Sequence, residues 1–160
     1  MSSGYDGVNT PSSSECEKPI DAEFTPAVPC SGKTYKIHLG DTKKVITVTE
    51  GEVMLQSPAE SRPGGGWYWV CVENGNWLGF RNHVSGNFLG HNGKTHGFQA
   101  KVTHHQALEF FCVRPHPRGD FMLLVKYPWG DEMRQVSCAP DGKTVVEKDK
   151  DGAQWVFEQV

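Results

Sequence analysis

The chain has 160 residues with a formal net charge of −3 and a sequence pI of about 6.1, which argues against a nucleic-acid-binding protein because such proteins need a basic face. No apolar run reaches the roughly 18 residues of a membrane-spanning helix, so no membrane contact is predicted. The length fits one domain with a real core, and 18 glycines and ten prolines favour a loop-rich all-β domain.

The N-terminal part of the sequence differs in composition from the rest. Residues 1–32 are rich in Ser, Gly, Pro and Asp and lack periodic apolar positions, which predicts a disordered or loosely docked arm. Residues 33–160 are predicted to form the domain. The first residues lack the charged and apolar regions of a secretory signal. Five cysteines, an odd number without CxxC spacing, do not predict a disulfide scaffold and favour a reducing cytoplasm.

From Lys33 onward the sequence predicts strands separated by turn residues. Apolar, β-branched and aromatic residues fill the strands, and Gly, Pro, Asn and Asp stand between them. The strands fall into three groups of four. In chain order the groups are 34–39, 43–49, 52–57 and 67–72; then 77–82, 87–91, 97–102 and 108–113; then 121–127, 133–138, 143–148 and 154–160.

Two landmarks give the three groups a common period. The turn glycines Gly51, Gly93 and Gly142 are 42 and 49 residues apart. The closing strands carry apolar pairs that are 41 and 47 residues apart, and their second members are predicted to be buried at equivalent places. These pairs are Trp67/Trp69, Leu108/Phe110 and Trp155/Phe157.

Three repeats of four strands favour a β-trefoil, in which six strands close a short barrel and six form hairpins that cap one end. Closing the barrel leaves no unpaired edge strand. A three-bladed propeller is smaller than the usual four to eight blades, and a generic sandwich is the other alternative. The predicted fold class is therefore an all-β trefoil with a flexible N-terminal arm.

The middle repeat carries a resemblance to a known family. Residues 81–113, with the step Gly86-Asn87-Phe88-Leu89 followed by a glycine turn and an aromatic closing strand, resemble one repeat of the fascin and hisactophilin trefoils. The resemblance is clearest over residues 75–113, whereas the first and third repeats match in pattern only. It implies a non-catalytic binding module whose partner is a protein surface such as actin.

Five of the seven histidines lie within this region. Histidine titrates near neutral pH and ligates metals when neutral. If they converge on one end of the barrel, they predict a pH-modulated binding surface; exposed loop histidines without a ligand are the alternative. HExxH spacing and His paired with CxxC are absent, so no metal site and no cofactor are predicted. The five are His83, His91, His96, His104 and His105.

Sugar binding is a further alternative. The Q-x-W motif of ricin-type trefoil lectins is absent, so a sugar site would need another geometry, for instance an exposed Trp77 or Trp129 stacked on a sugar face. The complete set of predicted binding residues is Trp77, Arg81, His83, His91, His96, His104, His105 and Trp129.

Catalysis is the remaining alternative. No nucleophile elbow, phosphate-binding loop or dinucleotide fingerprint is present. A small isomerase or cyclase acting on a hydrophobic metabolite would need a pocket with one histidine and one carboxylate. His38 near Asp41, or His83 near Glu109, are the candidate pairs. The loop at 57–66 suits a protease inhibitor poorly, because its glycines make it costly to order.

Overall fold

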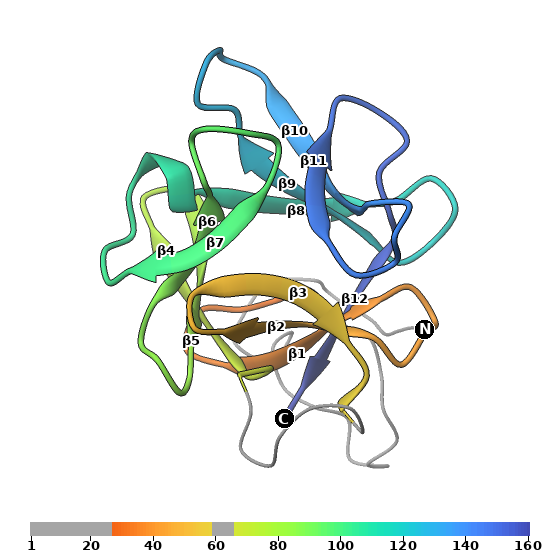
Figure 1. Ribbon diagram of the computed structural model, residues 1–160, viewed down its shortest axis with the longest axis horizontal. Helices are drawn as coiled ribbons and strands as arrows, with labels where there is room; N and C mark the ends of the chain where they lie inside the picture. The colour runs from red at the N-terminus through yellow and green to blue at the C-terminus, as the bar shows by residue number, and fades with distance from the viewer. Residues whose placement is uncertain (1–26, 59–65) are drawn as a thin grey trace, which may run out of the picture.

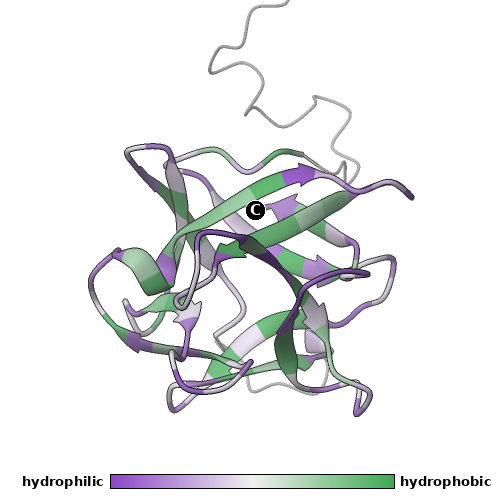
Figure 2. Cartoon of the chain, turned by 90° about the horizontal axis from the view of Figure 1, so that it is seen from above, coloured by the Kyte–Doolittle hydropathy of each residue, from purple (hydrophilic) through white to green (hydrophobic). Residues whose placement is uncertain are grey.

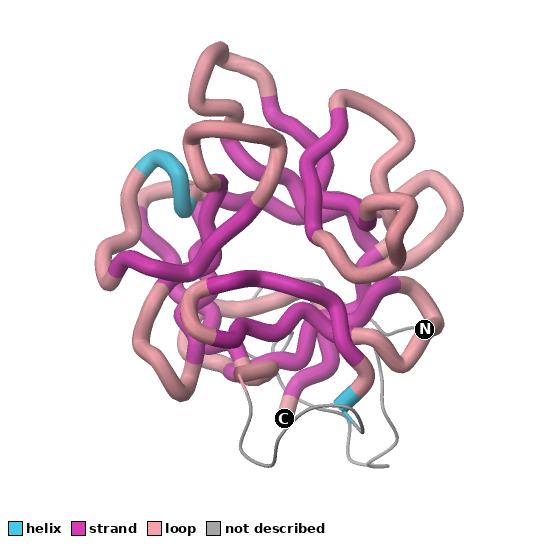
Figure 3. Tube along the Cα trace, viewed as in Figure 1, coloured by secondary structure: helices cyan, strands magenta, loops and turns pink. Residues whose placement is uncertain are grey.

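The computed structural model describes residues 27–58 and 66–160, and β strands dominate them (Figures 1 and 3). Each predicted strand overlaps one observed strand, and three of them match from end to end. The strands are β1 (Thr34–Leu39), β2 (Val45–Thr49), β3 (Glu52–Gln56), β4 (Trp69–Asn74), β5 (Trp77–Asn82), β6 (Phe88–His91), β7 (Phe98–Val102), β8 (Phe111–Pro115), β9 (Phe121–Lys126), β10 (Met133–Cys138), β11 (Val145–Lys148) and β12 (Trp155–Gln159).

Six of these strands form a closed antiparallel circuit. β1 pairs with β4 and β12, β5 pairs with β4 and β8, and β9 pairs with β8 and β12. The other six form the hairpins β2–β3, β6–β7 and β10–β11. Because the circuit closes on itself, its strands have no free edge.

The three hairpins contact one another around a common centre, toward which β3, β7 and β11 lie in Figure 1. At each junction one strand donates a backbone N–H to a carbonyl at the turn of the next hairpin. The three hairpins are thereby held in a ring by one repeated contact. The bonds are Leu55 to Lys143 (2.7 Å), Ala100 to Gly51 (3.1 Å) and Glu147 to His96 (2.8 Å).

Large apolar side chains fill the interior of the circuit. Tyr35, Phe80 and Phe157 are fully buried, and the Phe157 ring contacts both of the others at centroid distances of 6.3 and 5.9 Å. Hydrophobic colour in Figure 2 accordingly concentrates on the strands and hydrophilic colour on the connecting loops. Burial of this apolar surface is the main favourable contribution to folding.

The closing strands of the three groups begin with equivalent buried residues. Trp69, Phe111 and Trp155 are each fully buried, and each opens its strand. Trp69 and Trp155 also donate their indole N–H groups at 2.8 Å to backbone carbonyls of the preceding hairpins. Each of the three faces a residue of its group's first strand: Tyr35 faces Trp69, Leu78 faces Phe111 and Phe121 faces Trp155.

This register corrects the predicted one in two groups. Trp69 was placed correctly, but its partners are Phe111 and Trp155, one residue later and two residues earlier than the predicted Phe110 and Phe157. In the middle group the predicted strand began at Leu108, whereas a 3₁₀ turn occupies Ala107–Glu109. The turn delays the strand, so Phe110 is only half-buried.

The end of the predicted arm is bonded to the domain. Gly32 donates its backbone N–H to Cys71 O at 2.7 Å, and Cys30 N–H donates to the Tyr35 hydroxyl at 2.7 Å. Cys30 is disulfide-bonded, which the odd cysteine count did not predict. The rest of the predicted arm, residues 1–26, and most of the predicted loop at 57–66 lie outside the described residues. No helix within the described ranges is long and apolar enough to cross a membrane.

Candidate functional site

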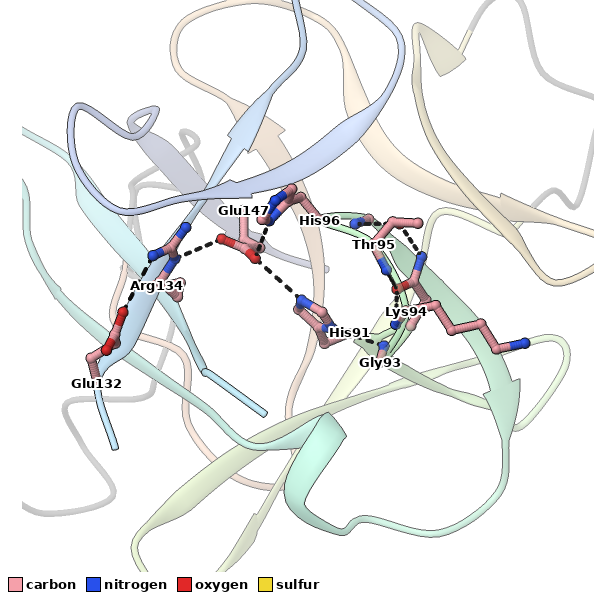
Figure 4. A network of polar contacts seen from close by, with 10 residues as sticks. His91, Gly93, Lys94, Thr95, His96, Glu132, Arg134 and Glu147 are labelled. Atoms are coloured by element: carbon pink, nitrogen blue, oxygen red, sulfur yellow. Dashed lines mark hydrogen bonds and ion pairs between the residues drawn. The ribbon is translucent and has the colours of Figure 1, made fainter. Parts of the chain in front are cut away.

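A buried carboxylate connects three polar side chains where two hairpins meet (Figure 4). Glu147, on β11, has a side chain with no exposed surface. Its Oε1 accepts a hydrogen bond from Arg134 Nε at 2.7 Å, and its Oε2 lies 2.7 Å from His96 Nδ1 and 3.4 Å from His91 Nε2. Both carboxylate oxygens are therefore engaged by groups from two other elements.

Glu147 stands where the other two hairpins place core residues. The repeated junction contact makes it equivalent to Leu55 and Ala100, which are 2% and 0% exposed. Burying a carboxylate is costly unless it is paired and hydrogen-bonded. One junction of the three is thus polar where the other two are apolar. Departures of this kind from core patterning concentrate at functional sites.

His91 fixes the protonation pattern of this cluster. Its Nδ1 accepts the backbone N–H of Gly93 at 2.9 Å, so this nitrogen carries no proton. The proton therefore resides on Nε2, which points at Glu147. Burial lowers the pKa of His91, and the attraction of Glu147 only partly opposes that effect. The imidazole is accordingly held neutral near pH 7.

Glu147 is held in its charged form. Burial raises its pKa, but hydrogen bonds from His96 and Arg134 outweigh that effect and leave the pKa below its usual value. A general acid would need the opposite, a raised pKa. The carboxylate is also inaccessible to a ligand. The arrangement therefore suits binding and positioning better than proton transfer.

An exposed aromatic ring lies next to the cluster. Trp129, in the loop between β9 and β10, is 54% exposed. Its ring makes edge-to-face contacts with His91 and with Tyr127, both at 5.4 Å between centroids. The Arg134 guanidinium lies 4.6 Å from the centre of the Tyr127 ring, and its Nη1 lies 3.3 Å from Glu132 Oε2. We call Trp129, Tyr127, Arg134, His96 and Glu132 the Trp129 surface.

The predicted histidines fall into separate groups. His91 and His96 share Glu147, but His104 lies against Glu109, with Nδ1 3.5 Å from Oε1. His105 donates Nε2–H to Leu78 O at 3.1 Å, and its ring stacks on Phe88. His83 is exposed in the turn after β5. Of the five predicted histidines, Glu147 therefore brings together two, His91 and His96.

The other predicted residues lie elsewhere. Trp77 stacks on Phe110 with a centroid distance of 5.3 Å and an interplanar angle of 3°, and Arg81 lies on β5. His38 Nε2 is 2.6 Å from Glu158 Oε1, and His38 also lines a surface hollow of about 510 Å³ together with its predicted partner Asp41.

Glu109, the predicted partner of His83, faces His104 instead. It is buried, and burial raises its pKa. Its Oε1 accepts the backbone N–H of Gln106 at 3.1 Å. The 3₁₀ turn that delays β8 ends at Glu109, and its capping contact holds the carboxylate against the start of the same turn.

Sequence reasoning missed Glu147, Arg134, Tyr127 and Glu132. One signal was present: in the strand at 145–148 the alternation places Glu147 on the same face as Val145, which is the core face. A charged residue at a core-facing position marks a paired or functional group. Among residues 27–58 and 66–160, no group of three potential ligands is arranged to hold a metal ion.

Neither family models nor curated proteins match the chain. Among solved structures it resembles the GlcNAcα1-4Gal-releasing endo-β-galactosidase from Clostridium perfringens, with a TM-score of 0.67 and 14% identity over 80% of this chain and 32% of the galactosidase. It also resembles the cytolethal distending toxin from Haemophilus ducreyi, with a TM-score of 0.57 and 13% identity over 79% of this chain and 81% of the toxin chain. The chain thus spans about a third of the galactosidase. At such identities the likeness shows an all-β fold.

These comparisons correct the prediction of a fascin-like, actin-binding module. The similar structures are a glycosidase and a toxin, and no family model of fascin type matches. The step that carried the resemblance has a structural explanation. Gly86 adopts a positive φ of 78°, and Phe88 and Leu89 enter the core. The motif therefore records a turn followed by a buried strand, which many β proteins need, and says nothing of a partner.

Proposed function

We propose that the chain is a non-catalytic, carbohydrate-binding β-trefoil domain and that the Trp129 surface is its sugar site. The observation that carries this proposal is the exposed Trp129 ring packed on His91, which in turn contacts the buried, paired Glu147 at one hairpin junction out of three. An exposed indole against an ordered polar cluster is a preformed platform, whereas an isolated exposed tryptophan would need no explanation.

The trefoil part of the proposal rests on repeated contacts. Each group of four strands supplies two strands to the closed circuit and one hairpin to the cap. The facing pairs of the barrel and the three junction bonds each occur once per group. Three copies of the same contacts in one chain are what a threefold trefoil requires.

The chemistry of the surface matches that of a sugar. A pyranose ring has an apolar C–H face, which an indole covers well, and a rim of hydroxyl groups that need hydrogen-bond partners. His96 and Glu132 have side chains that are 64% and 56% exposed, and both lie against the cluster. Hydrogen bonds to charged groups are about twice as strong as neutral ones, so the rim can orient a sugar on Trp129.

At the Trp129 surface, the state of Glu147 favours binding without cleavage. A glycosidase uses two carboxyl groups on either side of the bond, one of them an acid of raised pKa. Here Glu147 is buried, with both oxygens engaged and a lowered pKa. The likeness to an endo-β-galactosidase supports a sugar-related role. Because this chain corresponds to about a third of the galactosidase, it fits one domain of such a protein and not a complete enzyme.

The proposal also includes the cellular location of the protein. The predicted cytoplasmic location rested on the odd number of cysteines. Disulfides persist mainly in oxidising compartments, so the disulfide at Cys30 favours a site of action outside the reducing cytosol.

A glycan array tests the proposal. The wild type is expected to bind a subset of immobilised glycans, and Trp129→Ala is expected to weaken that binding by about fivefold or more, since stacking on one aromatic ring contributes on the order of 1 kcal/mol. Trp77→Ala is the matched control, because the Trp77 ring already stacks on Phe110. Absence of glycan binding, or a loss that follows Trp77 and not Trp129, contradicts the proposal.

A further inference from the structure

We infer that the Trp129 surface selects uncharged saccharides and rejects sugar acids, with Glu132 as the specificity-determining residue. This inference rests on the proposed function and deepens it. It follows from the charged side chains near Trp129 and from the partners that each of them already has.

The guanidinium of Arg134 is already hydrogen-bonded to two protein carboxylates. Arg134 donates Nε–H to Glu147 at 2.7 Å and Nη1–H to Glu132 at 3.3 Å. One face of the group covers the Tyr127 ring, and the side chain is only 16% exposed. A sugar carboxylate or sulfate would have to displace a protein carboxylate to form the bidentate contact that such anions prefer.

Two other nitrogen-bearing side chains come from the β6–β7 turn. His96 uses Nδ1 to contact Glu147 Oε2 at 2.7 Å. Lys94 belongs to the same turn, but its side chain points away from Glu147 in Figure 4. Within the described residues, an acidic ligand on Trp129 would therefore find the guanidinium of Arg134 already paired with two carboxylates.

The accessible charge beside the platform is negative. Glu132 is 56% exposed, and its Oε1 lies 3.3 Å from the point where a side chain at Gly130, the residue after Trp129, would begin. Asp131, exposed in the same loop, adds a second negative charge. The loop that carries Trp129, residues 127–132, therefore holds two carboxylates and no Lys or Arg. They attract hydroxyl donors and repel a second anion.

Gly130 makes this placement possible. A side chain there would start 3.3 Å from both Glu132 Oε1 and the Tyr127 ring, a distance that forces one of them to move. Because Gly130 has no side chain, the loop closes with Tyr127 N–H donating to Glu132 O at 3.1 Å. The Glu132 carboxylate is held on this loop by Arg134, whose Nη1 donates to Oε2 at 3.3 Å.

The test uses an array of neutral oligosaccharides, each printed beside its sialylated and its sulfated counterpart. The wild type is expected to bind the neutral members at least about tenfold more tightly than their acidic counterparts. Glu132→Gln, which keeps the shape and removes the charge, is expected to bring that ratio below about threefold. Raising the salt concentration should likewise lower the wild-type ratio of neutral to acidic glycan affinity, because salt screens exposed charges.

Glu52→Gln is the matched control. Glu52 is also an exposed carboxylate in a salt bridge, 3.4 Å from Lys101 Nζ, but it lies at another hairpin junction. It is expected to leave the ratio unchanged. Equal or tighter binding of the acidic glycans, or a ratio that Glu132→Gln does not alter, overturns the inference while the proposed function stands. Absence of binding to every glycan overturns both.

Discussion

The imidazole of His91 and the carboxylate of Glu147 face each other across the junction of β6 and β11, with Nε2 and Oε2 3.4 Å apart and both side chains fully buried. The two residues are 56 positions apart in the sequence. The other nitrogen of the ring accepts the Gly93 N–H, so one buried histidine connects the core carboxylate to the β6–β7 turn. The stability of this end of the molecule should therefore depend on pH.

His91 predicts a loss of stability on mild acidification. Because burial lowers its pKa in the folded state from the ordinary 6.5, unfolded chains take up the proton first. Stability is fully present above pH 6.5 and declines as the pH falls from there toward the folded-state pKa, by at most about 1.4 kcal/mol per pH unit. Urea unfolding of the wild type at pH 7.5, 6.5 and 5.5 measures this slope.

The variant His91→Asn tests whether His91 is the source. Its side-chain oxygen can accept the Gly93 N–H but does not titrate, so the slope between pH 7.5 and 5.5 should become shallower. His116→Asn is the control: His116 Nδ1 likewise accepts the N–H two residues on, from Arg118, at 3.1 Å, but Nε2 faces a backbone carbonyl. An equal slope in wild type and His91→Asn would show that another group titrates.

Removing the Glu147 charge should be strongly destabilising. Glu147→Gln leaves the Arg134 guanidinium, which is 16% exposed, without its best partner. Breaking one side of a buried ion pair typically costs roughly 3–5 kcal/mol. Chemical denaturation at pH 7.5 measures the cost, with the exposed-carboxylate variant Glu52→Gln expected to lose well under about 1 kcal/mol.

The same carboxylate predicts a second acid transition. The pKa of Glu147 is lowered in the folded state, so its contribution is present above the unfolded value near 4.5 and is lost as the pH falls through the folded value. In Glu147→Gln the loss of stability below about pH 4.5 should therefore be smaller than in the wild type. A wild-type curve that is flat between pH 4.5 and 3 would contradict the lowered pKa.

Two adjacent phenylalanines test the barrel register. Phe111 is fully buried and Phe110 is half-buried against Trp77 and His105. Phe111→Ala should cost roughly 3–5 kcal/mol, the usual range for a buried phenylalanine, and Phe110→Ala clearly less. Melting or urea curves of the two variants, measured side by side, give the order. The reverse order would restore the register expected from the sequence.

Gly79 is predicted to be intolerant of a side chain. A Cβ at this position would lie 2.6 Å from His105 Nε2, the atom that donates to Leu78 O. Gly79→Ala should therefore destabilise the protein by roughly 1–3 kcal/mol, the usual cost of overpacking. In a His105→Ala background the same change should cost much less, and this double-mutant cycle isolates the steric contact. Additive losses would place the cause elsewhere.

The sequence by itself determined the strands, because strand formation here depends on local patterns. Alternating apolar positions and turn residues placed all twelve, and Thr34–Leu39 and Trp77–Asn82 match from end to end. Periodicity fails where a turn interrupts it without a Gly or Pro. The 3₁₀ turn at Ala107–Glu109 is held by the Glu109 carboxylate and the Gln106 N–H, a contact that has no periodic signature.

The residues of the candidate site come together only in the tertiary structure. The five histidines are neighbours in sequence, but hairpin closure brings His91 and His96 to Glu147, whereas His104 faces Glu109 in the following loop. Glu147 and Trp129 join them from the third group of strands. A polar group can be buried only where distant partners neutralise it, so the cluster exists only after the hairpins meet, and local sequence carries just one trace of it, a glutamate on the core face of a strand.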